Sequence, residues 1–277
     1  MMRVLLLSMY YPPEIGSNAR IVEGLGQQLT ELGDEVTIVT GFPHYPDGII
    51  QPDYRGKFLL RQQLNNGIRV IRSWLFAAPR ERKWFRIANY LSFALSAIVG
   101  GLLAGRHDVI YVYSPPLFLG ITAHVLSRLK RIPFVLNVQD IYPDIAIHHG
   151  VIRNKMLIRA LEKLERWVYR KAAHITVISE GFGENLGSKG VAPGKITVIS
   201  NWVETHLFTP RSKDNSFSQE FGLLGGRFVV MYAGNIGHSQ GLETVVEAAR
   251  LLRDESSILF VIVGDGVKRR ETVDLAH

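Results

Sequence analysis

Short apolar runs alternate with segments of helical periodicity along most of the chain. Continuous apolar runs are typical of parallel strands that are buried on both faces, and apolar residues three and four apart are typical of helices packed on such a sheet. The order strand, loop, helix, strand is that of βαβ units, so the pattern predicts an α/β fold with a parallel sheet. The strands predicted in the first part of the chain are residues 3–8, 36–40, 109–113, 134–138, 174–178 and 196–199.

A second strand pattern lies between the first βαβ unit and the next strand. Residues 58–64 and 68–74 flank Asn65, Asn66 and Gly67. Asn-Gly between two apolar runs is the strongest short hairpin signal. We therefore expect an antiparallel pair near the edge of the sheet.

Residues 87–105 form the longest uncharged stretch, nineteen residues between Arg86 and Arg106. That length just reaches what a bilayer span requires. A crossover helix is also due here, because a predicted strand follows. Three alternatives stay open: a helix packed on the sheet, a helix on a membrane surface beside the basic residues 80–83, and a true span.

The C-terminal part repeats the strand and loop pattern with glycine-rich turns. Residues 230–241 read as a buried strand, a loop with Gly234 and Gly237, and a helix that begins at Leu242. A second strand, residues 258–263, runs into Gly264 and Gly266. Such turns at the carboxyl ends of parallel strands hold phosphorylated ligands. Because residues 209–219 are polar, we predict domains at 1–208 and 227–277 with a linker at 209–226.

Composition narrows the chemistry. The chain has no cysteine, which removes disulfides and thiolate metal sites. Through residue 208 there are 24 Lys and Arg against 16 Asp and Glu, and afterwards 8 against 9, so the basic excess lies in the first part. Nucleic acid, anionic lipid and phosphorylated substrates all suit such a surface, and charge alone does not choose among them.

Two residues at predicted strand ends stand out in the first part. Gly16 opens a helix and could offer its backbone N–H to an anion, or it could serve the turn alone. The loop lacks the G-x-G-x-x-G pattern of NAD and FAD sites. Asp140 follows a buried strand and could orient a hydroxyl or accept its proton, or it could cap a helix or pair with a basic helix. His148 and His149 have no further ligand at suitable spacing, so we expect no bound metal.

Several segments in this order resemble the retaining glycosyltransferases of family 4. They are MRVLLLSMYYPPEIGSNAR, VQDIYPD, VISEGFGENLGSKGVAPGKITVISNWVETHLFTP, and GNIGHSQGLETVVEAARLL followed by VGDG. The resemblance covers nearly the whole chain. It is strongest to the bacterial group that builds O-antigen, capsule and exopolysaccharide repeats, including enzymes assigned to L-fucosamine transfer.

The resemblance implies a GT-B architecture, with a Rossmann-like acceptor domain followed by a Rossmann-like domain that binds the sugar nucleotide. Gly16 would offer its amide to the donor diphosphate, and Gln139, beside Asp140, would take the place of the family's His-containing motif. An Arg and a Lys of the family would be replaced by Asn235 and Gln240. The donor-binding residues implied in the second domain are Gly234, Asn235, Gly237, Gln240, Gly264 and Gly266, and the catalytic ones are Asp140 and Gly16.

The implied reaction is transfer of a sugar from a nucleotide sugar, expected to be UDP-linked, to a polyprenyl-diphosphate-linked saccharide at the cytoplasmic face of the membrane. No metal, cofactor or nucleic acid is implied. The family's paired-glutamate segment would follow residue 266, and the short remainder predicts a C-terminally truncated second domain of low stability. Activity of this chain alone stays open, and a non-catalytic membrane-binding remnant is the alternative.

Overall fold

The computed structural model describes the whole chain except residues 46, 65, 79–82 and 149, and the side chain of residue 83. It consists of two compact units, Met1–Trp202 and Val203–His277. The division falls six residues before the end of the domain predicted at residue 208. Each unit is described by itself below.

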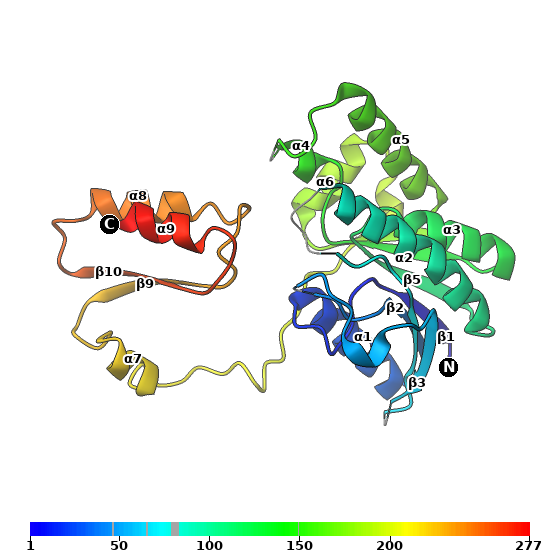
Figure 1. Cartoon of the computed structure of the whole chain (residues 1–277), viewed down its shortest axis with the longest axis horizontal. Helices are drawn as coiled ribbons and strands as arrows, with labels where there is room; N and C mark the ends of the chain where they lie inside the picture. The colour runs from blue at the N-terminus through cyan, green and yellow to red at the C-terminus, as the bar shows by residue number, and fades with distance from the viewer. Residues whose placement is uncertain (46, 65, 79–82, 149) are drawn as a thin grey trace. The chain divides into compact units, whose positions relative to one another are not determined.

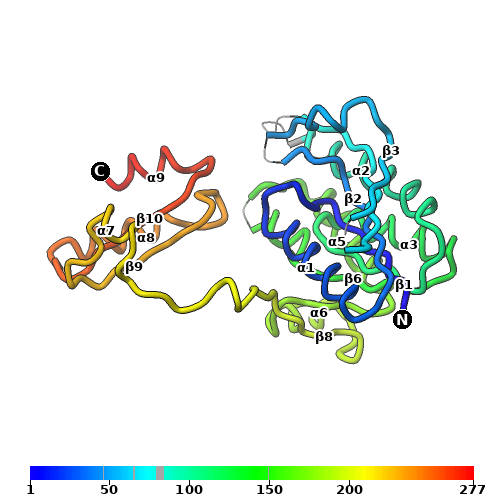
Figure 2. The backbone as a smooth tube through the Cα atoms, turned by 90° about the horizontal axis from the view of Figure 1, so that it is seen from below, coloured from blue at the N-terminus to red at the C-terminus, as the bar shows by residue number. Residues whose placement is uncertain are grey.

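The first unit is built on one eight-stranded sheet of order β3-β4-β2-β1-β5-β6-β7-β8. All neighbouring strands are parallel except the antiparallel pair β3 and β4. The predicted α/β fold is therefore confirmed, and Figure 2 shows β3 and β8 at opposite ends of the sheet. The strands are β1 Arg3–Leu7, β2 Glu35–Gly41, β3 Leu59–Gln63, β4 Arg69–Ser73, β5 Val109–Ser114, β6 Phe134–Val138, β7 His174–Val177 and β8 Ile196–Val198.

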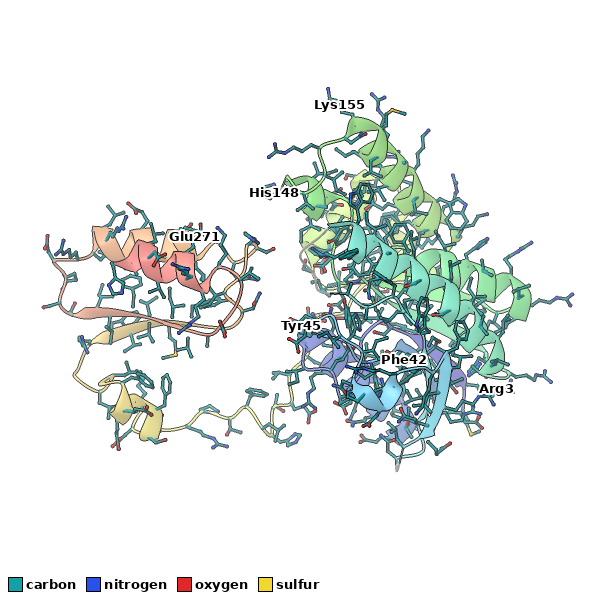
Figure 3. All side chains as sticks on the ribbon, viewed as in Figure 1. Arg3, Phe42, Tyr45, His148, Lys155 and Glu271 are labelled. Carbon is teal, nitrogen blue, oxygen red and sulfur yellow. The ribbon has the colours of Figure 1, made fainter. Side chains whose placement is uncertain are left out.

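Helices cover both faces of this sheet. In β1, Leu5 and Leu7 point to one face and Val4 and Leu6 to the other, and all four are buried. The first face packs against α2, α3, α5 and α6, and the second against α1. Figure 3 shows Phe42 among packed side chains and Lys155 at the periphery. The helices are α1 Ser17–Glu31, α2 Lys83–Leu103, α3 Leu119–Lys130, α4 Asp144–His148, α5 Lys155–Lys171 and α6 Glu180–Ser188, with short 3-10 turns η1 Pro52–Tyr54 and η2 Pro193–Lys195.

The predicted hairpin lies at the sheet edge. β3 pairs antiparallel with β4, and β4 continues the sheet parallel to β2. The Leu64 N–H donates to the carbonyl of Ile68 at 2.9 Å and closes the turn. Of the three turn residues used for the prediction, Asn65 lies outside the described residues.

The uncharged stretch forms α2, which packs on the sheet with one side. Phe93 and Ala97 are fully buried there. A Cβ on Gly100 would lie 2.5 Å from the Ser73 hydroxyl oxygen, and one on Gly101 would lie 2.4 Å from a Leu126 methyl group, so the Gly-Gly pair permits close packing on β4 and α3. By length and composition alone, residues Trp84–Leu103 are apolar enough to cross a membrane. An 18-residue segment of this helix has a mean hydropathy of 1.4, and 33% of that segment is buried.

The second unit contains two parallel strands, β9 Phe228–Ala233 and β10 Ile258–Val263. The helices α8 Leu242–Leu251 and α9 Arg269–Ala276 pack against each other on one side of them (Figure 1). The short helix α7, Ser216–Glu220, precedes the strands and lies in the predicted linker. Two apolar side chains of β9 remain exposed, Phe228 at 72% and Met231 at 45%. Low stability of this unit stays a prediction.

His107, just before β5, makes the first unit sensitive to acid. Its side chain is buried, and burial together with the charges of Lys130 and Arg69 lowers the imidazole pKa to about 4. In an unfolded chain the pKa is about 6.5. Between these values the unfolded chain binds more protons, so the free energy of unfolding falls as the pH is lowered through this window. We expect this histidine to lower the free energy of unfolding by up to about 3 kcal/mol between pH 7 and pH 4.

Denaturant unfolding at pH 7 and pH 4 measures this effect. Trp74, Trp84, Trp167 and Trp202 are the only tryptophans of the sequence, so their fluorescence reports on the first unit alone. The variant His107→Gln should lose less stability on acidification than the parent chain, and His148→Gln, at an exposed site of the first unit, should behave like the parent. Equal losses in all three chains would refute the assignment.

Candidate functional site

The loop between β1 and α1 places Gly16 at the N-terminus of a fifteen-residue helix. Gly16 has φ 178° and ψ 154°, an extended conformation open to any residue. A Cβ there would meet only Tyr45 Cε1, at 4.0 Å. Neither the turn nor the packing therefore requires glycine. No described side chain caps this helix and its first turn has no acidic residue, so its positive end is open to an anion.

A buried carboxylate fixes this loop against the loop after β2. Glu14 accepts hydrogen bonds from the backbone N–H groups of His44, at 2.9 Å, and Tyr45, at 3.0 Å. The buried Arg72 guanidinium donates to the Pro12 carbonyl, and its burial lowers the pKa of that group. The attraction between Glu14 and Arg72 partly offsets that lowering. These contacts set the position of Gly16, and sequence patterning identified neither charged residue.

Asp140 lies just beyond β6, half-buried, with its pKa raised by burial. No described residue forms a hydrogen bond or ion pair with its carboxylate. Burial raises the pKa of Tyr113, and the charge of Asp140 adds to that rise. The Tyr113 hydroxyl donates to Asn18 in the first turn of α1 at 3.1 Å. Asp140 and the start of α1 thus flank the same tyrosine at the carboxyl edge of the sheet. The described residues show neither the cap nor the ion pair considered for Asp140.

Four residues further on, Asp144 does form an ion pair, but with Lys189 after α6 and not with a basic residue of α5. Lys189 Nζ lies 2.8 Å from an Asp144 oxygen and 2.7 Å from Glu165 Oε1. Glu165 is 1% exposed and also accepts a hydrogen bond from the Tyr169 hydroxyl at 3.0 Å. Burial raises the Glu165 pKa, and the bond to Lys189 opposes that change. The network joins α4 to α5 and α6 and so anchors the loop that carries Asp140.

Gln139, beside Asp140, is engaged in a chain of amides. Its Nε2 donates to Asn137 Oδ1 at 2.8 Å and to Asn201 Oδ1 at 3.0 Å, and Asn201 Nδ2 donates back to Gln139 Oε1 at 2.8 Å. Asn137 in turn donates to Thr176 on β7. Gln139 therefore orders the strand ends around Asp140.

The two glycine loops of the second unit are hydrogen-bonded to each other. Gly234 N–H donates to the Val263 carbonyl, and Ile236 N–H donates to the Asp265 carbonyl. A Cβ on Gly264 (φ 155°) would lie 1.8 Å from the Gly234 carbonyl oxygen. One on Gly266 (φ 153°) would lie 2.4 Å from the Ile236 carbonyl oxygen. Close approach of the loops alone thus accounts for Gly264 and Gly266, which the sequence assigned to ligand binding.

Asn235, Gly237 and Gln240 gather at one point of the first glycine loop. A Cβ on Gly237 would lie 2.6 Å from Asn235 Nδ2 and 2.7 Å from Gln240 Oε1. Lys268, whose N–H donates to the Ile236 carbonyl, pairs through its ammonium with Glu271 and Glu243. The loop therefore offers uncharged amide donors to a ligand, and the nearby Lys268 ammonium is already paired with two carboxylates.

The predicted residues thus form two groups, Gly16 and Asp140 in the first unit and the six loop residues in the second. Among the described residues, no three His, Cys, Asp or Glu side chains gather as a metal site would require. His149 of the histidine pair lies outside the described residues, and the absence of a metal stays a prediction.

Residues 17–202 match the family described as "Glycosyl transferase 4-like domain". The match covers more than half of the chain, and the chain belongs to this family. The resemblance to family 4 glycosyltransferases that the sequence motifs indicated is confirmed.

Two relatives carry similar names. "Putative colanic acid biosynthesis glycosyl transferase WcaI" of Escherichia coli K12 is 27% identical over 273 residues, covering 96% of this chain and 66% of the relative. "Probable glycosyltransferase WbjE" of Pseudomonas aeruginosa is 29% identical over 165 residues, covering 59% and 41%. The chain thus spans about two thirds or less of the relatives it matches.

Solved structures share the fold. Anabaena Alr3699/HepE, in complex with UDP and glucose, superposes with a TM-score of 0.63 at 16% identity, covering 100% of this chain and 65% of that one. Sucrose-phosphate synthase from Thermosynechococcus elongatus superposes with a TM-score of 0.66 at 16% identity, covering 99% and 65%. These similarities support the predicted Rossmann-like fold of GT-B glycosyltransferases.

Proposed function

We propose that this protein transfers a sugar from a nucleotide sugar to a lipid-linked saccharide in bacterial surface polysaccharide synthesis, with retention of anomeric configuration. The observation that carries the proposal is the glycine loop at the end of β9, where Asn235, Gly237 and Gln240 gather just before α8. Family membership and the polysaccharide role in the name of the Escherichia coli relative support it.

The donor we propose is a UDP-sugar, since the structural neighbour Alr3699/HepE was crystallised in complex with UDP and glucose. Within the second unit, its diphosphate would be held by the amides of Asn235 and Gly237 rather than by cations. Backbone N–H groups at helix N-termini stabilise such anions, and fixed dipoles continue to do so as the leaving group gains charge.

In the proposed reaction, a hydroxyl of the acceptor attacks the anomeric carbon from the face that the diphosphate leaves. The new bond joins the acceptor oxygen to that carbon, and the bond to the diphosphate oxygen breaks. Asp140 orients the hydroxyl or accepts its proton, a role that suits a carboxylate without a described cation partner. The charge left on the diphosphate is stabilised by the glycine-loop amides.

We also propose that the protein lies on the cytoplasmic face of the membrane through α2. The outward side of this helix exposes a line of apolar side chains, Trp84, Leu91, Leu95, Val99 and Leu102. An apolar helix face with a tryptophan near one end is typical of helices bound at a membrane interface. Of the basic residues considered for lipid binding, Arg80 and Arg82 lie outside the described residues, as does the side chain of Lys83.

Replacing Leu95 with glutamate tests this orientation. Leu95 is 68% exposed, and the change should weaken binding to vesicles of phosphatidylglycerol and phosphatidylethanolamine by about tenfold or more, because it removes buried apolar surface and adds a repelled charge. Leu129→Glu, at a leucine of α3 that is 61% exposed, is the matched control. Equal binding by both variants would contradict the placement of α2 on the membrane.

Release of UDP from a panel of UDP-sugars tests the transfer itself. We expect release that rises when vesicles containing polyprenyl-diphosphate-linked saccharides are added, and none from ADP-sugars. Vesicle binding without UDP release from any donor would favour the alternative, a non-catalytic membrane-binding protein of this family.

A further inference from the structure

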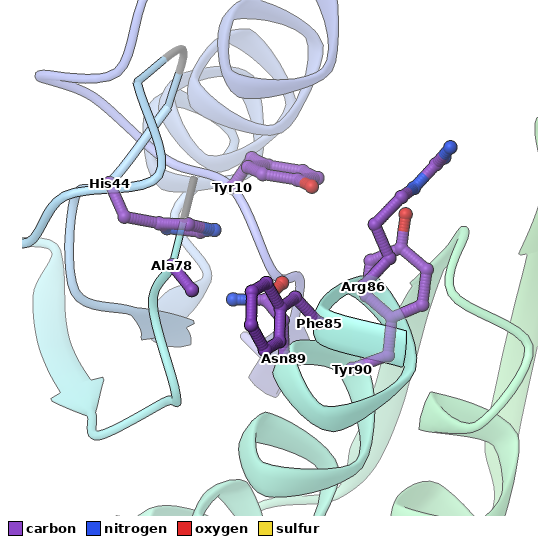
Figure 4. Close-up of a pocket in the computed structure, with 7 residues that line it drawn as sticks. All are labelled: Tyr10, His44, Ala78, Phe85, Arg86, Asn89 and Tyr90. Atoms are coloured by element: carbon purple, nitrogen blue, oxygen red, sulfur yellow. The ribbon is translucent and has the colours of Figure 1, made fainter. Parts of the chain in front are cut away.

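A narrow pocket opens beside the loops that follow β1 and β2, at the N-terminal end of α2. Figure 4 shows the aromatic rings of Tyr10, Phe85 and Tyr90 around it, and the other lining residues are His44, Ala78, Arg86 and Asn89. The space for the centres of water-sized groups is about 10 Å³. One water molecule or one hydroxyl group requires about that much.

The imidazole of His44 is held rigidly at this pocket. Its Nδ1 lies 3.0 Å from the Phe42 carbonyl oxygen and 3.2 Å from Glu14 Oε1. Because the Phe42 carbonyl oxygen and the Glu14 carboxylate oxygen both accept hydrogen bonds, the neutral ring carries its proton on Nδ1, and Nε2 presents a lone pair. Tyr10 stacks on the ring at 5.9 Å between centroids, with planes 16° apart.

The second ring nitrogen lacks a partner within the part of the chain that the structure describes. His44 is 4% exposed, and its Nε2 is buried without a hydrogen bond. Figure 4 shows the ring pointing into the pocket, beneath Tyr10. A buried acceptor without a partner is costly, so a ligand that donates a hydrogen bond there is favoured.

The surroundings favour a sugar as that ligand. Aromatic rings stack on the apolar faces of sugars and leave the sugar hydroxyl groups free to form hydrogen bonds elsewhere. Here Tyr10, Phe85 and Tyr90 supply such rings. The pocket itself admits one hydroxyl, and Nε2 of His44 is the acceptor that this hydroxyl would meet. Arg86 at the mouth is exposed and hydrogen-bonded to Tyr90.

We propose that His44, positioned by Glu14, accepts a hydrogen bond from one hydroxyl of the acceptor saccharide and thereby selects the sugar to be extended. This rests on the proposed glycosyltransferase function, in which the first unit binds the acceptor. His44 acts as a specificity residue, and Glu14 is a positioning residue that holds the imidazole in the required tautomer.

Two substitutions of His44 separate this role from folding. In His44→Asn the amide nitrogen can still donate to the Phe42 carbonyl, but nothing replaces Nε2. In His44→Gln the amide reaches the level of Nε2 and can again accept from a hydroxyl. The probes are methyl α-glycosides of glucose, galactose, N-acetylglucosamine and L-fucose, titrated into the full chain while the ring nitrogens of His44 are followed by NMR.

At least one glycoside should shift the Nε2 resonance, and its Kd should rise about 3- to 10-fold in His44→Asn, the effect of one neutral hydrogen bond. His44→Gln should recover part of the loss, and UDP binding should be equal in all three chains. Absence of any Nε2 shift, or equal Kd values in the parent and His44→Asn, overturns the proposal. Glycoside binding without UDP release from any donor supports the pocket and counts against the transferase function instead.

Discussion

Replacing Asp140 with asparagine is expected to lower the rate of sugar transfer by about 10²- to 10³-fold and to leave the first unit as stable as before or slightly more so. The loss reflects the removal of a group that orients or deprotonates the acceptor hydroxyl. Stability should not fall, because no described residue pairs with this carboxylate and burial already disfavours its charged form.

The pH dependence gives a second test of the same residue. Burial raises the Asp140 pKa, so transfer should decline as the pH falls through a value above the usual carboxyl range, because the protonated acid no longer accepts a proton. Asp140→Asn should lack this decline. Asp144→Asn, at the first residue of α4, is the matched control, since Asp144 pairs with Lys189 and its loss should weaken folding more than transfer. Unchanged transfer in Asp140→Asn would remove Asp140 from the mechanism.

Replacing Gly264 with alanine is expected to destabilise the second unit by about 3 kcal/mol or more and to abolish nucleotide binding. The new Cβ would lie 1.8 Å from the Gly234 carbonyl oxygen, and φ is 155°, which disfavours any residue with a side chain. Because the contact is between backbones, no rotamer change relieves it. The two loops would have to separate, and the cluster of Asn235, Gly237 and Gln240 would lose its support.

Amide hydrogen exchange in β9 and β10 is the appropriate probe, since the second unit has no tryptophan. Gly225→Ala is the matched control, because its nearest new contact would be Arg227 Nε at 3.9 Å and its φ is not in the left-handed region. Protection and UDP binding should be lost in Gly264→Ala alone. Parent-like exchange in both variants would show that the loops do not pack as described.

The fold could be predicted from the sequence where apolar periodicity is long and continuous. β1, α1 and β6 follow this rule, and so do β9 and β10. The short helices α7 and α9 were not predicted, because their polar sequences resemble a linker and a terminus. A capping signal was present for α7, where Asn215 and Ser218 bond reciprocally.

The candidate site was predicted only as far as strand order determines it. Gly16 and Asp140 follow central strands, and the carboxyl ends of parallel strands lie along one edge of a sheet. The sequence could not identify Glu14 and Arg72, because their partners are distant in the chain and meet only after folding. For the same reason, the packing role of Gly264 and Gly266 could not be predicted, because it depends on contacts with a second loop that is distant in the sequence.

The anomeric configuration of the product is the most direct test of the proposed reaction. The chain would be incubated with an α-linked UDP-sugar and a polyprenyl-diphosphate-linked saccharide, and the anomeric proton coupling of the new linkage would be read by NMR. Attack on the face from which the diphosphate leaves predicts an α-linked product. A β-linked product, or UDP release without a new linkage, would contradict retaining transfer.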